Sequence, residues 1–205
     1  TCFCFELPRA PGQAAVLFDL LRRRAGDYAT VPVIFNDLVQ AGLRVPGWER
    51  ELPFTALRRF HALHNIGIPG EDVSGLERAL RRYHWAGVFH PRASLWYLPK
   101  KRASLSLAIA FALLCDYRRV VLCGVDLNRP DYFYEAPEYR ARGLPIYETP
   151  KEAVHSTATQ AGNPLGIDAI VGAMQRALLP RRGVELFVAL PSSGLHPRVP
   201  AFFPE

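Results

Sequence analysis

The strongest constraint on the fold is an apolar stretch that runs from Ser104 to Asp126 with one polar interruption. Residues 104–115 are apolar almost all round, which predicts a helix buried against a sheet. Residues 116–119 (Asp-Tyr-Arg-Arg) turn the chain. Residues 120–126 are again apolar, which predicts a central parallel strand that is covered on both faces. A helix, a tight turn and a buried strand in this order indicate an α/β fold.

The remaining segments supply further helices and strands. Short apolar stretches rich in branched or aromatic residues predict strands at residues 1–5, 31–35 and 184–190. Helical spacing of apolar residues predicts helices at residues 14–24, 38–42, 54–63, 73–85 and 163–179. His90-Pro91 indicates a turn, and the first five residues resemble a strand already in progress. We therefore expect an N-terminal unit of the fold to precede Thr1.

Two segments lack regular periodicity. Residues 128–154 form a long polar loop with four tyrosines, and a loop of this length inside a compact domain is usually functional. Residues 194–205 are rich in proline and predict a tail that wraps the surface. Together the patterns predict one Rossmann-like domain over residues 1–205, with a mostly parallel sheet, flanking helices and a lid at residues 128–154.

The composition is that of a soluble globular protein, with 49% hydrophobic and 21% charged residues. The longest apolar run, residues 105–114, is too short to span a membrane. Four cysteines at these positions make no disulfide framework, and Cys115 and Cys123 are expected to be buried as small hydrophobic residues. A reduced cytoplasmic protein fits these features best.

The net charge of +6 favours anionic partners, such as nucleotide phosphates, acidic sugars or an anionic membrane surface that the protein contacts peripherally. The arginine and lysine clusters occur at residues 22–24, 58–59, 81–82, 100–102 and 181–182. Each cluster could instead cap the C-terminal end of a helix or lie on a solvated face. Aromatic residues do not interleave with the clusters, so no nucleic-acid partner is expected. His61 and His64 have no second ligand pair nearby in sequence, so no metal is expected.

Polar residues gather where a Rossmann-like fold binds its ligands, beyond the carboxyl ends of the strands. Asp126 ends one predicted strand, and Ser192 and Ser193 follow another. Lys101, Arg102 and Ser104 lead into a buried helix whose N-terminal N–H groups and dipole favour an anion, and this set of side chains suits a nucleotide phosphate.

His155 follows the long loop, directly before Ser156. An imidazole at the mouth of such a site could remove a proton from an attacking hydroxyl, because its pKa lies near neutral pH. Alternatively, His155 caps a turn or hydrogen-bonds a carbonyl group.

Several of these segments together resemble the small bacterial CMP-sialic-acid-dependent sialyltransferases: residues 102–126, the tyrosine loop, His155-Ser156, the helix that follows at 163–179, and residues 184–193. The resemblance implies a Rossmann-like domain with a mobile lid, no metal or other cofactor, and a sugar transfer that inverts the anomeric centre. It assigns the general base to His155 and a donor-phosphate contact to Tyr132. It also assigns nucleotide contacts to Ser104 and to the basic residue Lys101 or Arg102. The acceptor would be a glycan or a lipid-linked glycan.

The chain departs from this family at two places. Asn128 occupies the position of a second phosphate-binding tyrosine, and we expect it at the nucleotide site. The glycine-rich turn near the start of the family's fold is missing, since Pro11-Gly12 does not form one. Either the first unit precedes this chain or the donor binds differently. Another CMP-activated acidic sugar, such as Kdo, would suit the same phosphate site.

Two other functions remain open from the residues. A Mg²⁺-dependent enzyme that transfers pyrophosphate to a pterin could use Asp126 with Asp131 or Glu135 as metal ligands. A non-catalytic protein could assist polysaccharide assembly through its basic surface. The sequence leaves the oligomeric state open.

Overall fold

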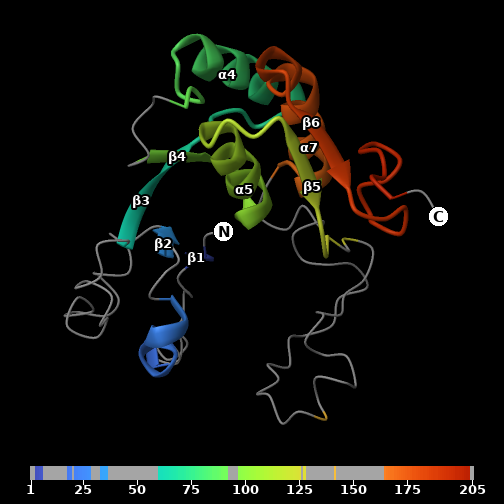
Figure 1. Cartoon of the computed structure of the whole chain (residues 1–205). Coiled ribbons are helices and arrows are strands. Elements are labelled where there is room, and N and C mark those ends of the chain that lie inside the picture. Colours follow the sequence, from blue (N-terminus) through green and yellow to red (C-terminus); the bar gives the residue numbers. More distant parts are fainter. Residues whose placement is uncertain are drawn as a thin grey trace. The chain divides into compact units, whose positions relative to one another are not determined.

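The computed structural model describes residues 3–6, 18–19, 21–28, 33–36, 60–91, 97–125, 127, 141 and 164–203 (Figure 1). The chain divides into two compact units, one from residues 1–66 and 94–99 and the other from residues 67–93 and 100–205. Both contain helical residues and short strands, several of which pair in parallel. The described chain is therefore mixed α/β, as the sequence predicts at this level.

The first unit is built on a four-stranded sheet in the order β1-β2-β3-β4. The strands are β1 (Phe3–Glu6), β2 (Val33–Asn36), β3 (Phe60–Gly67) and β4 (Tyr97–Lys100). β1 and β3 both pair in parallel with β2. A short 3-10 helix, η1 (Ala25–Tyr28), follows helical residues at 18–19 and 21–23. The predicted strands at residues 1–5 and 31–35 and the helix at 14–24 are confirmed where they are described.

The helix predicted at residues 54–63 is wrong for residues 60–63, which begin β3. Phe60 pairs with Val33 and Leu63 with Asn36. Helix propensity is a weak preference, and hydrogen bonding to a neighbouring strand overrides it. The helix predicted at 38–42 lies outside the described residues.

The second unit contains three helices and a parallel strand pair among its described residues. The helices are α4 (Val73–Trp85), α5 (Ala103–Leu114) and α7 (Ile167–Ala177), with the short 3-10 helix η4 (Pro180–Arg182). β5 (Arg119–Leu122) and β6 (Glu185–Val188) pair in parallel from Arg119 opposite Glu185 to Leu122 opposite Val188 (Figure 1). α4 has the bounds predicted for the helix at 73–85, and α5 confirms the helix at 104–115 with a shift of one residue. α7 and β6 confirm the helix at 163–179 and the strand at 184–190 with shorter ends.

A single apolar core holds the second unit together, and α4 and α7 pack side by side in it (Figure 1). The three helices supply most of its fully buried side chains: Leu76, Leu80, Ile109, Leu113, Ile167, Ile170, Val171, Met174. Residues 87–91 form the turn predicted around His90-Pro91, with the His90 N–H donating to the Gly87 carbonyl at 2.9 Å. No helix among the described residues has the length and apolarity required to cross a membrane.

Three expectations about burial are wrong. β5 is not covered on both faces, because Arg119 is exposed and Val120 and Val121 are only half-buried. Its sheet holds β6 as its one partner strand among the described residues, so no further strands shield it. Cys115 and Cys123 are exposed, because one follows the last turn of α5 and the other follows the last paired residue of β5.

The C-terminal segment is not a surface tail in its described part. Leu195 and Val199 are buried in the core, with 1% and 0% of their surface exposed. The Val188 N–H donates to the Pro200 carbonyl at 3.0 Å, and the Phe202 N–H donates to the Val188 carbonyl at 2.8 Å. These bonds satisfy the free edge of β6, and the apolar side chains gain burial against the same core.

Candidate functional site

The predicted site begins where β5 and β6 end, and parallel strands end at the same edge. The Ser193 hydroxyl donates to the Val125 carbonyl at 2.7 Å and accepts a long contact from the Leu195 N–H at 3.4 Å. The Ala189 N–H donates to the Leu122 carbonyl at 2.8 Å. The two segments that follow the strands are therefore tied together, as expected from their parallel pairing.

The two serines of this edge differ in exposure. Ser193 is buried, with 9% of its surface exposed, and its only hydroxyl proton is directed at the Val125 carbonyl. Ser192 is exposed and can reach a ligand from solvent. Ser192 is therefore the better candidate for a ligand contact, while Ser193 positions the turn. The other predicted residues of this edge and its lid lie outside the described residues and stay predictions: Asp126, Asn128, Tyr132, His155, Ser156.

The beginning of α5 is organised by a serine that the sequence did not single out. The Ser106 side chain is fully buried, and its hydroxyl donates to the Arg102 carbonyl at 2.7 Å. The backbone nitrogens of Lys101 and Arg102 each lie 3.4 Å from its Oγ. This hydroxyl thus lies near two backbone N–H groups that directly precede the helix. Ser104 is exposed at the first turn. The run Ser-Leu-Ser-Leu contains both serines and gives no signal as to which one faces inward.

Both basic residues before α5 donate to backbone carbonyls. Lys101 Nζ donates to the Gly70 carbonyl, and an Arg102 guanidinium nitrogen donates to the Leu165 carbonyl at 3.2 Å. Leu165 lies just before α7, so the Arg102 bond links the first residues of two core helices. A phosphate at this place would share Lys101 and Arg102 with these carbonyls.

The basic residues at 181–182 cap the C-terminal end of a helix, which was the expected alternative to binding an anion. An Arg181 guanidinium nitrogen donates to the Ala177 carbonyl at 2.9 Å, at the C-terminal end of α7. Arg118 donates to the Arg182 carbonyl at 2.9 Å, and Arg182 lies 3.5 Å from the Asp116 carboxylate. Cations near helix C-termini satisfy carbonyl groups and oppose the helix dipole. This cluster therefore stabilises the helix end.

One histidine in this region has a shifted pKa. Partial burial lowers the pKa of His84, and the charges of Arg182 and Arg181 lower it further. Both effects disfavour the imidazolium form. The neutral imidazole form of His84 is therefore favoured beside the two arginines.

No family model, no curated protein sequence and no solved structure matches this chain. Within the described ranges, three or more His, Cys, Asp or Glu side chains nowhere gather closely enough to hold a metal ion.

Proposed function

We propose that the chain is a glycosyltransferase that moves an acidic sugar, sialic acid or a Kdo-like sugar, from a CMP-activated donor to a hydroxyl of a glycan. The observation that carries the proposal is the common carboxyl edge of β5 and β6, which the bond from Ser193 to the Val125 carbonyl joins. Open α/β sheets bind their ligands beyond this edge. The proposal includes a Rossmann-like arrangement of the chain and the sialyltransferase-like motifs of its C-terminal half.

The basic residues before α5 support a phosphate site on the same side. Four residues, 115–118, separate α5 from β5, so we expect the helix to run opposite to the strand. In that arrangement the first residues of α5 lie towards the edge where β5 ends. Lys101 and Arg102 then bring positive charge to the donor phosphate, and the exposed Ser104 and Ser192 bring hydroxyl groups.

The proposed reaction uses His155 as the general base. The acceptor oxygen attacks the anomeric carbon, the bond from this carbon to the CMP phosphate oxygen breaks, and the acceptor proton passes to His155. Tyr132 and the basic residues stabilise the charge that develops on the departing CMP. The loop at 128–154 closes over the donor and excludes water, which would otherwise hydrolyse it.

Nucleotide-dependent stabilisation of the full chain tests the donor class. Thermal unfolding is measured with CMP, CDP, UDP, GDP and ATP. The proposal expects stabilisation by the cytidine nucleotides, about 2.7 kcal/mol at a hundred times the dissociation constant. No stabilisation by CMP at millimolar concentration would refute it and would favour a non-catalytic role in polysaccharide assembly.

A substitution at position 155 tests the mechanism. His155→Ala should reduce the transfer rate by about 100- to 10,000-fold, the usual effect of losing a positioned base, without changing stabilisation by CMP. His90→Ala, at an exposed turn, is the matched control and should keep the full rate. A strict requirement of activity for Mg²⁺ would instead favour pyrophosphate transfer.

A further inference from the structure

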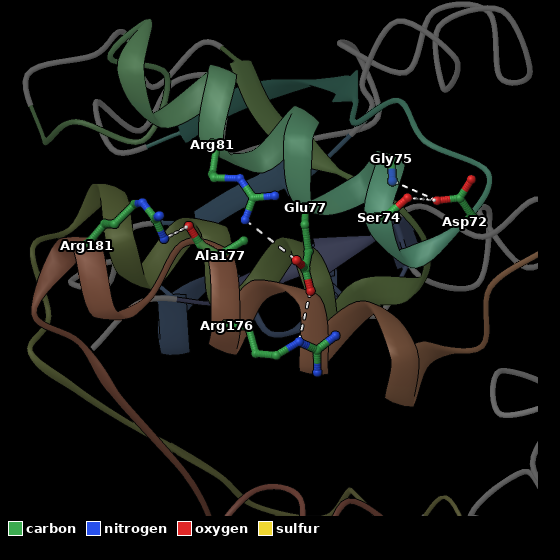
Figure 2. A network of polar contacts seen from close by, with 8 residues as sticks. All are labelled: Asp72, Ser74, Gly75, Glu77, Arg81, Arg176, Ala177 and Arg181. Carbon is green, nitrogen blue, oxygen red and sulfur yellow. Dashed lines mark hydrogen bonds and ion pairs between the residues drawn. The ribbon is translucent and has the colours of Figure 1, made fainter.

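α4 carries charged side chains with two different surroundings. Glu77 lies between two arginines, with one carboxylate oxygen 2.8 Å from Nε of Arg176 on α7 and the other 3.6 Å from Arg81 (Figure 2). Arg78 and Arg82 are each one residue further along the helix, which turns their side chains about 100° away from this network. Among the described residues, the Glu77 carboxylate therefore pairs with Arg81 and Arg176 and not with Arg78 or Arg82.

Arg78 and Arg82 line a hollow of about 370 Å³ within the second unit. The other lining residues are small or apolar in large part: Pro69, Gly70, Gly75, Ala79, Tyr83. Within the part of the chain that the structure describes, neither guanidinium forms an ion pair or hydrogen bond. Both side chains are exposed, so they can turn towards a ligand in the hollow.

The walls of the hollow are fixed by packing. Gly70 has a φ of +116°, and a Cβ at this position would lie 2.4 Å from the backbone nitrogen of Leu76. Only glycine lets the segment at 68–70 lie so close to the first turn of α4. On the other side, the Tyr83 hydroxyl donates to the Gly67 carbonyl at 3.0 Å, which holds the ring in place.

The charges beside the hollow are mostly positive. Lys101 Nζ lies on the Gly70 carbonyl and adds a third cation to the two arginines. Asp72, which precedes α4, accepts hydrogen bonds at 2.7 Å from the Gly75 N–H and from the Ser74 hydroxyl (Figure 2). These two bonds lower the pKa of Asp72, and the charge of Arg78 adds a smaller effect. The Asp72 carboxylate is thus engaged in capping the helix.

We propose that this hollow binds the phosphate monoester of a small organic molecule. Arg78 and Arg82 lie one helical turn apart, so their guanidinium groups can donate to different oxygens of one phosphate, for which arginine is the preferred partner. The organic part of the ligand lies against Pro69, Ala79 and the Tyr83 ring. A cation near the C-terminal end of a helix opposes the helix dipole, which would explain an arginine at position 82, in the last turn of α4. It would not explain an arginine at position 78, in the middle of the helix. Lys101 lies beside the hollow and is also assigned to the proposed donor site, but Arg78 and Arg82 belong to the hollow alone, so this proposal does not depend on the donor site.

Calorimetric titration of the full chain with phenyl phosphate and with inorganic phosphate tests the proposal. Phenyl phosphate should bind more tightly, because the apolar wall contacts its ring. Arg78→Gln and Arg82→Gln should each weaken this binding about tenfold or more, the effect of losing one charge-assisted hydrogen bond. Arg81→Gln makes the same change on the same helix at a residue paired with Glu77, and should weaken binding less than about twofold. Circular dichroism verifies that all three variants fold.

Further measurements distinguish a lipid phosphate from a soluble phosphate ester, and this proposal from that of the donor site. Phosphatidylcholine vesicles with and without phosphatidic acid are compared, and binding that requires both phosphatidic acid and the two arginines identifies a lipid phosphate as the source. Binding of phenyl phosphate alone identifies a soluble ester. Failure of phenyl phosphate and of phosphatidic acid to bind, or an equal loss in Arg81→Gln, overturns the proposal. CMP-dependent stabilisation should remain in Arg78→Gln, so the donor site is judged separately.

Discussion

Replacing Ser106 by alanine tests which group organises the beginning of α5. The Ser106 hydroxyl is fully buried and donates to the Arg102 carbonyl at 2.7 Å and to the Ala103 carbonyl at 3.2 Å. Two backbone nitrogens make long contacts of 3.4 Å with its oxygen. Its removal leaves the polar groups of the first turn without this partner. Ser104, two residues earlier and exposed, provides the matched control.

The expected loss follows from these distances. A net hydrogen bond contributes about 0.5–1.5 kcal/mol, and the two long contacts add little because hydrogen bonds weaken with distance. We therefore expect the lost interactions to cost about 1–2 kcal/mol. Alanine has the higher helix propensity and returns up to about 0.5 kcal/mol. The free energy of unfolding should fall by about 1 kcal/mol in Ser106→Ala and by clearly less in Ser104→Ala, because the Ser104 side chain is exposed.

Urea unfolding of both variants, followed by far-UV circular dichroism, measures the difference directly. A thermal scan should show the same order, since about 1 kcal/mol corresponds to roughly 2–4 °C in a chain of this size. The reasoning is refuted if Ser104→Ala loses as much stability as Ser106→Ala. In that case the exposed serine, rather than the buried one, holds the first turn.

Three further changes probe other parts of the structure. Gly70→Ala should lower the free energy of unfolding by about 2 kcal/mol or more, because its Cβ would lie 2.4 Å from a backbone nitrogen. Gly26→Ala, with no atom within 4 Å of the added Cβ, should cost far less, and comparable urea midpoints would contradict this account. Glu77→Gln should cost about 0.5–1 kcal/mol at low ionic strength and less in high salt; a salt-independent loss would argue against the ion pairs. Partial burial lowers the pKa of His84 below 6.5, so the folded state binds fewer protons than the unfolded chain. Stability should therefore fall as the pH drops below about 6.5, and His84→Gln should reduce that fall in urea midpoints compared across this range; an unchanged slope would exclude the effect.

The helices of the second unit could be predicted because their signals are local. Residues 104–115 form an apolar run too long for an ordinary strand, and residues 73–85 repeat apolar side chains at helical spacing after an acidic start. β3 could not be predicted in the same way. Its residues contain helix formers such as Ala62 and Leu63, and only pairing with β2, distant in sequence, makes them a strand.

Burial was harder to predict than element type. The apolar run at 120–126 indicates residues that favour burial, but the sequence does not state how many neighbouring strands and helices will cover them. β5 has one described partner strand, and Cys123 just after it is exposed. Conversely, the prolines at 194–205 suggested a surface tail, although Leu195 and Val199 enter the core.

At the candidate site, the sequence predicts which segments lie close together but not which atoms their polar side chains bond to. The approach of the segments after β5 and β6 follows from parallel pairing, which the sequence predicts. The partners of the hydroxyl and amine groups do not follow from it. Ser193 and Lys101 were both expected to reach a ligand, and each donates to a backbone carbonyl. A polar side chain near a site can donate a hydrogen bond to the protein's own backbone as readily as to a ligand, since buried carbonyls also require a donor.

The arginines of α4 show why a basic cluster in sequence differs from one in space. Arg81 and Arg82 are adjacent in the chain, but neighbouring side chains on a helix are about 100° apart. Arg81 therefore pairs with Glu77, while Arg82 lies with Arg78 beside the hollow. The two residues that can act together on one anion are four apart, and they are not the pair that sequence adjacency singles out. On this helix, the periodicity places Arg78 and Arg82 on the side of the hollow and Arg81 on the side of Glu77.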